Sequence, residues 1–176
     1  AASSLDALYV VKQWNASDDY GTPVQKAQVV LADGTQAPID RNDFTFMKDG
    51  EKQSFDYAYI TIHGTPGENG LLQGYLDMMH IPYSCCGVLA AALTFNKFAC
   101  NHYLEDFGIR ISPSVLLRKH AARPTDEEII KQVGLPCFIK SNVGGSSFGC
   151  TKVKTLEEVT PAIERAFEEG NEVICE

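Results

Sequence analysis

The sequence FIKSNVGGSSFGCTKV, residues Phe138–Val153, decides how the C-terminal part of this chain is interpreted. A run of residues typical of a β-strand, Cys137–Ile139, leads into it, and an alternating run, Cys150–Val153, follows it. Between them, Gly144–Gly149 contains three glycines and two serines, so its backbone N–H groups can approach an anion with no Cβ in the way. The stretch therefore predicts a β-hairpin whose loop binds a phosphate-like anion.

Two lysines flank this loop, Lys140 before it and Lys152 after it, and both would attract an anion held there. Two common nucleotide-binding loops do not fit. A Walker A loop and a Rossmann fingerprint both open a helix, whereas the residues after Gly149 alternate as in a strand. A plain flexible hairpin turn is the alternative for the loop by itself.

Composition limits the classes of partner. The 176 residues suit one large or two small domains, and 44% hydrophobic residues are enough for a core. A net charge of −8 argues against nucleic acid and anionic membranes as partners. No apolar run approaches the roughly 20 residues of a membrane-spanning helix. The six cysteines show no metal-like spacing, which predicts reduced thiols, no metal site and a cytoplasmic location.

Both ends of the sequence predict an incomplete chain. It begins at Ala1 without methionine, and it stops at Glu172–Glu176, a run that resembles a strand. A bare final strand is a poor place for a fold to stop, because its backbone groups lack partners.

In the N-terminal part, Asp33-Gly34 predicts a hairpin between strands near 28–32 and 36–39. Asp40–Phe46 and Lys48–Ser54 are interpreted as a polar surface excursion with another Asp-Gly turn at Asp49-Gly50. Phe55–Ile62 carries aromatic and β-branched residues on both faces, which predicts a central parallel strand. The glycine-rich turn His63–Gly70 follows it and opens a helix over Leu71–Met79, and ligand sites in open α/β sheets lie at such strand ends.

The C-terminal part predicts a split α+β unit. The basic stretch Arg118–Pro124 is taken as a domain boundary, and Thr125 with Glu128 forms a capping box that starts a helix. The remaining predicted elements are helices over Val88–Phe95, Lys97–Phe107 and residues 155–170, and strands over Val115–Leu117, Cys137–Ile139, Cys150–Val153 and Glu172–Glu176.

Four blocks together resemble the D-alanine–D-alanine ligases of the ATP-grasp superfamily. They are HGTPGENGLLQGYLDMMHIPY (His63–Tyr83), GVLAAALTFNK (Gly87–Lys97), GLPCFIKSNVGGSSFGCTKV (Gly134–Val153) and EVICE (Glu172–Glu176). The resemblance covers the chain from about Phe55 to its end. It implies an α/β fold, in which an open parallel-sheet, Rossmann-like (pre-ATP-grasp) domain over residues 1–118 precedes the first lobe of an α+β ATP-grasp domain over residues 119–176.

The resemblance also implies an activity and its partners. It implies an ATP-dependent ligase that phosphorylates the carboxylate of one D-alanine and lets the amine of a second displace phosphate, for peptidoglycan synthesis. ATP and D-alanine would be the ligands, Mg²⁺ or Mn²⁺ would be bound by ligands outside this chain, and a homodimer is expected. Cations and amides must then stabilise charge on the transferring phosphoryl group.

The resemblance assigns roles to individual residues. Lys97 and Lys140 match lysines that hold the nucleotide phosphates, although an arbitrary lysine would more often be a surface residue with a buried stem. The matching loop that closes over the phosphates consists of Gly144, Gly145, Ser146, Ser147, Phe148 and Gly149.

The remaining assignments concern the first D-alanine and the nucleotide base. Ser146 matches a serine beside the first D-alanine, with a plain turn serine as its alternative. His63 matches a histidine near the same substrate, and Glu68 matches the glutamate that orients it; a structural histidine is the alternative. Glu176 matches the acidic residue that begins the hinge beside adenine.

Some family features differ or are not found. Ser141 stands where proline is usual and Asn69 where aspartate is usual. The glycine-rich turn and glutamate of the family's first strand, and the second lobe with its arginine and metal-binding residues, are not found, so the chain by itself is not expected to be a competent enzyme. A ligase joining D-alanine to D-lactate or D-serine, and a nucleotide-binding fragment without turnover, remain as alternatives.

Overall fold

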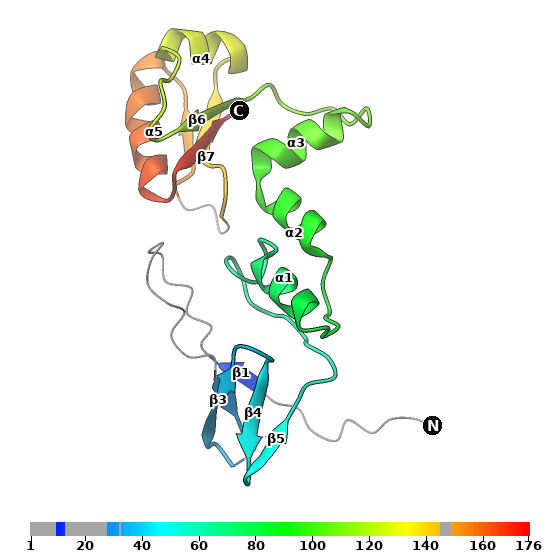
Figure 1. Cartoon of the computed structure of the whole chain (residues 1–176). Helices are drawn as coiled ribbons and strands as arrows, with labels where there is room; N and C mark the ends of the chain where they lie inside the picture. Colours follow the sequence, from blue (N-terminus) through cyan, green and yellow to red (C-terminus); the bar gives the residue numbers. More distant parts are fainter. Residues whose placement is uncertain (1–9, 13–27, 32, 145–148) are drawn as a thin grey trace.

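Two β-sheets lie at opposite ends of a run of three helices in the computed structural model, which describes residues 10–12, 28–31, 33–144 and 149–176 (Figure 1). The first sheet has the strand order β1-β2-β3-β4-β5 and every pairing in it is antiparallel. Its strands are β1 (Val10–Lys12), β2 (Gln28–Val30), β3 (Gln36–Asp40), β4 (Thr45–Lys48) and β5 (Glu51–Gln53).

The predicted Asp33-Gly34 hairpin is confirmed between β2 and β3. Asp33 Oδ1 accepts hydrogen bonds from the backbone N–H and the hydroxyl of Thr35, at 2.9 and 2.7 Å. Gly34 has a φ of +85°, a conformation that L side chains rarely adopt. The Asp49-Gly50 turn predicted within residues 40–54 is confirmed between β4 and β5. The two strands pair as a second hairpin, so this segment belongs to the sheet and is more than a polar surface excursion. Its buried Phe44 and Phe46 explain why a mostly polar segment stays in the sheet.

The predicted parallel strand over Phe55–Ile62 is also wrong as a regular strand. Within the described part of the chain, this segment is extended and forms one isolated parallel bridge, between Ala58 and Tyr83. Its inward residues pack on the first core, whereas Tyr57 and Tyr59 are 55% and 76% exposed. The aromatic residues on both faces suggested burial on both sides, but only one face is covered. The described N-terminal sheet is therefore antiparallel.

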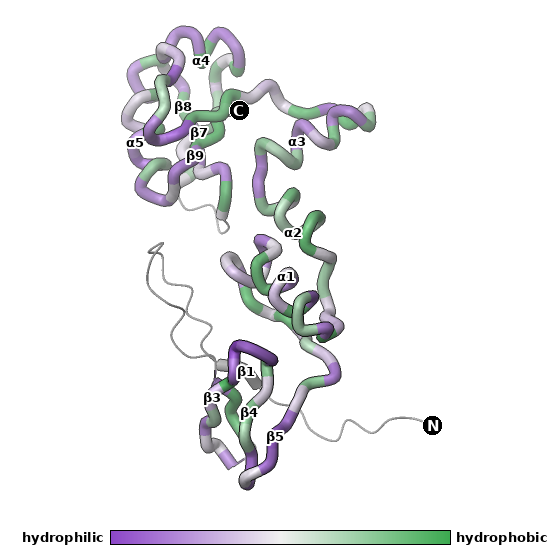
Figure 2. The backbone as a smooth tube through the Cα atoms, viewed as in Figure 1, coloured by the Kyte–Doolittle hydropathy of each residue, from purple (hydrophilic) through white to green (hydrophobic). Residues whose placement is uncertain are grey.

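Three helices connect the sheets: α1 (Leu71–Met78), α2 (Val88–Phe95) and α3 (Lys97–Glu105). Leu72 and Leu76 of α1 pack against the first sheet. The next helix, α2, is strongly apolar along its length (Figure 2), yet only Ala91 in it is buried. No helix in the described residues is long and apolar enough to cross a bilayer.

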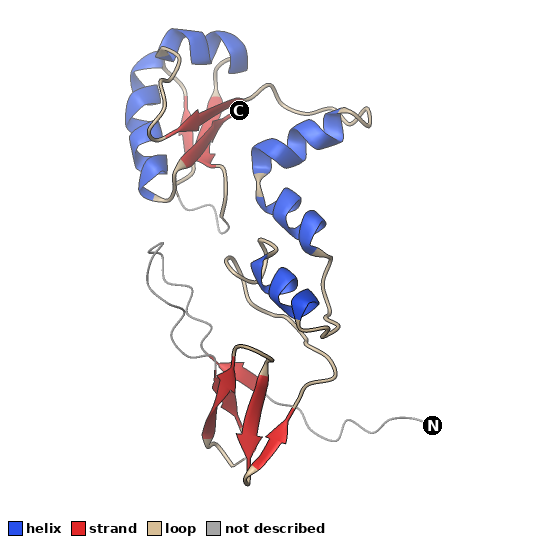
Figure 3. Ribbon diagram, viewed as in Figure 1, coloured by secondary structure: helices blue, strands red, loops and turns tan. Residues whose placement is uncertain are grey.

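The second sheet has the order β6-β9-β7-β8, again antiparallel, with two helices against it (Figure 3). Its elements are β6 (Val115–Arg118), α4 (Asp126–Val133), β7 (Cys137–Ser141), β8 (Thr151–Val153), the short 3₁₀ turn η1 (Leu156–Glu158), α5 (Val159–Glu168) and β9 (Glu172–Cys175). Alternate strand residues and the apolar faces of α4 and α5 form the second core, with Ile129, Ile139, Val153 and Val173 fully buried.

The last strand, β9, lies between β6 and β7 and is paired on both sides. The final strand, which was predicted to lack neighbouring strands, is thus central in the sheet. The predicted domain division after Arg118 leaves β6 on its N-terminal side, whereas β6 pairs with β9, so the second sheet begins before that point. The division itself remains a prediction.

Candidate functional site

Lys140 and Glu176 lie on the face of the second sheet opposite to α4 and α5. Because side chains alternate along β7, the buried Cys137 and Ile139 face the helices and Lys140 faces the other way. Lys140 Nζ donates to Glu176 Oε1 at 2.6 Å, and both side chains are largely shielded. Glu176 is fixed by backbone hydrogen bonds of 2.7 and 2.9 Å in both directions with Phe138.

Lys97, from a different part of the chain, reaches the end of the same strand. It is the first residue of α3, and its Nζ donates to the carbonyl oxygens of Ser141 at 3.1 Å and Gly144 at 3.0 Å. A longer contact of 3.4 Å joins it to the Asn142 carbonyl. The structure thus brings Lys97 to the entry of the loop that follows β7.

The electrostatic surroundings lower the pKa of Lys97 below its usual value. Partial burial is the main cause, because it disfavours the charged form, and the ammonium of Lys140 adds to it. Glu176 and Cys150 act in the opposite direction. Two lysines that repel each other in this way provide a place where an anion would be stabilised.

The loop itself is described only at its ends. Gly144 (φ +116°) and Gly149 (φ +65°) have backbone conformations that favour glycine. A Cβ on Gly149 would lie 2.9 Å from Cγ of Glu169, so α5 also approaches this position closely. The other predicted loop residues, Gly145, Ser146, Ser147 and Phe148, lie outside the described residues.

His63 and Glu68 lie in the turn before α1. Glu68 Oε2 accepts a hydrogen bond from the Gly64 N–H at 2.5 Å, and its Oε1 is 3.9 Å from His63 Nδ1. The His63 side chain is 98% exposed. The predicted pair is therefore adjacent but joined by a long contact, and Glu68 is the better fixed of the two residues.

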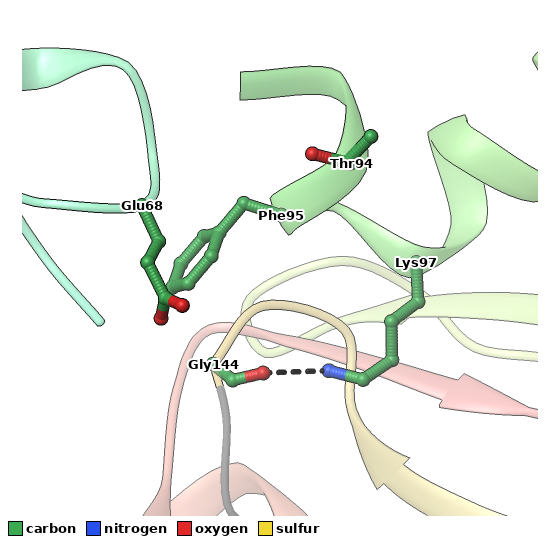
Figure 4. A pocket seen from close by; sticks show the side chains of 5 residues that line it. All are labelled: Glu68, Thr94, Phe95, Lys97 and Gly144. Atoms are coloured by element: carbon green, nitrogen blue, oxygen red, sulfur yellow. Dashed lines mark hydrogen bonds between the residues drawn. The ribbon is translucent and has the colours of Figure 1, made fainter. Parts of the chain in front are cut away.

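A cavity of about 260 Å³ separates these two groups of residues. Figure 4 shows Glu68 on one side and Lys97 with Gly144 on the other, with Phe95 of α2 between them. Thr94 completes the lining. The cavity places a carboxylate and an ammonium on two sides of a space that is large enough for a small polar ligand.

Asn142 is a site residue that the sequence interpretation missed. It is fully buried immediately after β7, and its side-chain oxygen accepts from the Phe98 N–H at 2.8 Å. A polar residue between a predicted strand and a glycine-rich loop is interpreted as part of the loop. Nothing in the sequence around Asn142 therefore indicates its contact with Phe98. Lys152 Nζ lies 5.9 Å from the ring centre of Phe138, and its attraction of an anion stays a prediction.

Metal ligands were not predicted in this chain. Among the residues that the structure describes, no three His, Cys, Asp or Glu side chains are grouped so that they could hold a metal ion.

Comparisons with solved structures define the class of protein. D-alanyl-alanine synthetase A from Vibrio cholerae superposes with a TM-score of 0.71 at 32% identity, over 82% of this chain and 44% of that one. A D-Ala:D-Ser ligase from Enterococcus faecalis gives 0.67 at 32% identity, over 80% and 42%. The fold is therefore that of the ATP-grasp ligases.

Sequence comparisons identify the family within this class. Residues 5–86 match the family described as D-ala D-ala ligase N-terminus, and residues 103–176 match the D-ala D-ala ligase C-terminus. D-alanine–D-alanine ligases from Phocaeicola vulgatus and Bacteroides fragilis are 66% and 63% identical over 149 residues, which is 85% of this chain and 46% of each relative. The chain belongs to the D-alanine–D-alanine ligase family, and it spans about half the length of these relatives.

Proposed function

We propose that this chain carries the phosphate-binding lobe and part of the first-substrate site of an ATP-dependent D-alanine–D-alanine ligase. One observation carries the proposal: Lys97 and Lys140, from separate segments, meet at the end of β7 beside the glycine-rich loop. Both residues match the family lysines that hold nucleotide phosphates. Two cations next to a sequence rich in glycine and serine suit a triphosphate.

The proposed reaction has two steps. A carboxylate oxygen of the first D-alanine forms a bond to the γ-phosphorus of ATP as the bond to ADP breaks, which gives an acyl phosphate. The amine of the second D-alanine then attacks the acyl carbon, loses a proton, and phosphate leaves. Lys97 and Lys140 would stabilise negative charge on the transferring phosphoryl group, which is the main requirement of this chemistry.

The remaining site residues are proposed to position the first D-alanine. Glu68, fixed by the Gly64 N–H, would orient His63 beside the substrate, and Ser146 would join them from the loop. Mg²⁺ or Mn²⁺ would be held by residues outside this chain. We also propose a homodimer and a cytoplasmic location. Light scattering tests the dimer, for which the measured mass should be twice that of one chain.

Two other functions are kept as alternatives. Similarity to the D-Ala:D-Ser ligase from Enterococcus faecalis is as high, at 32% identity, as to the Vibrio cholerae enzyme, so D-serine is a competing second substrate. A nucleotide-binding module without turnover is the other alternative. Phosphate release with D-alanine alone, compared with D-alanine plus D-serine or D-lactate, separates these cases.

The first experiment is a titration with ATP and Mg²⁺ by calorimetry. Lys97→Met and Lys140→Met should each weaken ATP binding about tenfold or more, because each removes a hydrogen bond to a charged group. Lys154→Met, at an exposed position after β8, is the matched control and should leave the affinity unchanged. Equal affinity in all four proteins would contradict the proposed phosphate site.

A further inference from the structure

Asn142 forms a buried hydrogen-bond network between the second sheet and the start of α3. Its Nδ2 donates to Asn96 Oδ1 at 3.0 Å and to Glu172 Oε2 at 2.8 Å. Its Oδ1 accepts from the Phe98 N–H at 2.8 Å. Both amide hydrogens and the oxygen are thus used, which fixes the side chain in one orientation at a position with no exposed surface.

The same residue holds the backbone of Lys97. The Asn142 carbonyl accepts from the Lys97 N–H at 3.1 Å, and Asn96 and Val143 form an antiparallel bridge beside it. The first N–H groups of a helix have no partner within the helix. Here Asn142 accepts hydrogen bonds from the N–H groups of Lys97 and Phe98, and Asn96 Oδ1 accepts one from the Ala99 N–H at 2.9 Å.

Glu172 fixes the other side of the network. Its backbone carbonyl accepts from the Asn142 N–H at 2.9 Å, and its second carboxylate oxygen accepts from Arg118 Nε at 3.1 Å. Because Glu172 and Arg118 belong to β9 and β6, Asn142 is tied to the sheet through two further strands. Because Asn142 is buried and all its side-chain polar atoms are paired, any other orientation would leave a buried polar group without a partner.

We propose that Asn142 is a positioning residue that places Lys97 beside Lys140, at the carbonyl oxygens of Ser141 and Gly144, so that both lysines contact one polyphosphate. The identity of that ligand rests on the proposed function, whereas the positioning does not. Without Asn142, the start of α3 loses its hydrogen-bond partners on the sheet. The Lys97 ammonium would then leave the carbonyl oxygens of Ser141 and Gly144.

The test measures Lys97 directly. Asn142→Leu keeps the branched outline of the side chain and removes its polar atoms, and Asn142→Ser is a smaller variant that retains a hydroxyl. The apparent pKa of Lys97 is obtained from the pH dependence of its acylation with acetic anhydride, resolved by mass spectrometry. Val153→Ala, a change in the same core away from α3, controls for a general loss of stability.

We expect the pKa of Lys97 to rise toward that of an ordinary lysine in Asn142→Leu and by less in Asn142→Ser. Val153→Ala should leave the pKa of Lys97 as it is in the original chain. ATP binding should weaken about fivefold in Asn142→Leu, the effect of losing one hydrogen bond of ordinary strength.

The positioning role would be overturned if the pKa of Lys97 were unchanged in both folded Asn142 variants. It would also be overturned if Val153→Ala changed that pKa as much as the Asn142 variants do. If the chain does not bind ATP but the pKa of Lys97 rises in the Asn142 variants, the proposed function is rejected and the positioning role is retained. The two conclusions therefore fail separately.

Discussion

At the scale of single residues, the surroundings of Lys97 change how readily it carries a charge. Burial and Lys140 lower its pKa, so the folded chain holds this proton less tightly than the unfolded chain does. The free energy of unfolding should therefore rise with pH between the lowered pKa and the ordinary value near 10.5. A bound polyphosphate would reverse the shift by favouring the ammonium form.

The corresponding prediction concerns pH and ATP affinity. Affinity should fall as pH rises through the lowered pKa of Lys97, before ordinary lysines lose their charge. Calorimetric titrations from neutral pH upward measure it. Lys97→Arg, whose side chain stays charged, should remove this early fall. The same pH dependence in both proteins would show that Lys97 does not contact the phosphates.

Cysteine exposure gives a second prediction at this scale. Cys85, Cys86 and Cys150 are exposed, whereas Cys137 and Cys175 are buried in the second core. Burial raises the pKa of Cys137 and raises that of Cys175 to about 12, which keeps these thiols protonated. A disulfide reagent should therefore label the three exposed thiols quickly and the two buried ones only after unfolding. Fast labelling of Cys175 in folded protein would contradict the described packing.

At the scale of elements, helix α4 begins with a capping box. The Thr125 hydroxyl accepts from the Glu128 N–H at 3.3 Å, and Glu128 Oε2 accepts from the Thr125 N–H at 2.9 Å. Thr125→Ala should lower the free energy of unfolding by about 1 kcal/mol, measured by urea denaturation. Glu164→Ala, at an exposed position on α5, should change it by less than about 0.5 kcal/mol. Equal losses would show that the cap does not stabilise α4.

Elements were predicted correctly where the residues that determine them lie close together in the sequence. The Asp33-Gly34 turn, the Thr125 cap and the strand before the loop carry their determinants within a few residues, and the structure contains all three. The turn of the β4–β5 hairpin was predicted, but its strands were missed because Phe44 and Phe46 are the buried hydrophobic residues in a mostly polar segment. Phe55–Ile62 was misinterpreted because periodicity shows which residues alternate, but not whether a neighbouring strand covers the second face.

The candidate site follows the same rule. The matched blocks indicated Lys97, Lys140 and Glu176, and the structure places Lys140 in contact with Glu176 and Lys97 close enough to both to be affected by their charges. Asn142 depends on partners in α3 and β9, which are distant in sequence, so no local pattern indicates it.

At the scale of the whole molecule, the described residues form two separate hydrophobic cores, one on each sheet. We expect them to unfold as separate cooperative units. Leu76→Ala and Ile129→Ala each remove a buried side chain of one core and should cost about 2–5 kcal/mol there. Hydrogen exchange by mass spectrometry should show faster exchange only around the mutated core. Faster exchange in both cores from either change would show one cooperative unit.

The central place of β9 has a consequence for synthesis on the ribosome. Strand β6 emerges early, but its neighbour in the sheet is β9, which is translated last of the four strands. Until residues 172–175 leave the exit tunnel, β6 and β7 have no strand between them, and their open edges could recruit other chains. The nascent chain should thus bind chaperones at the second sheet until the last strand of that sheet inserts.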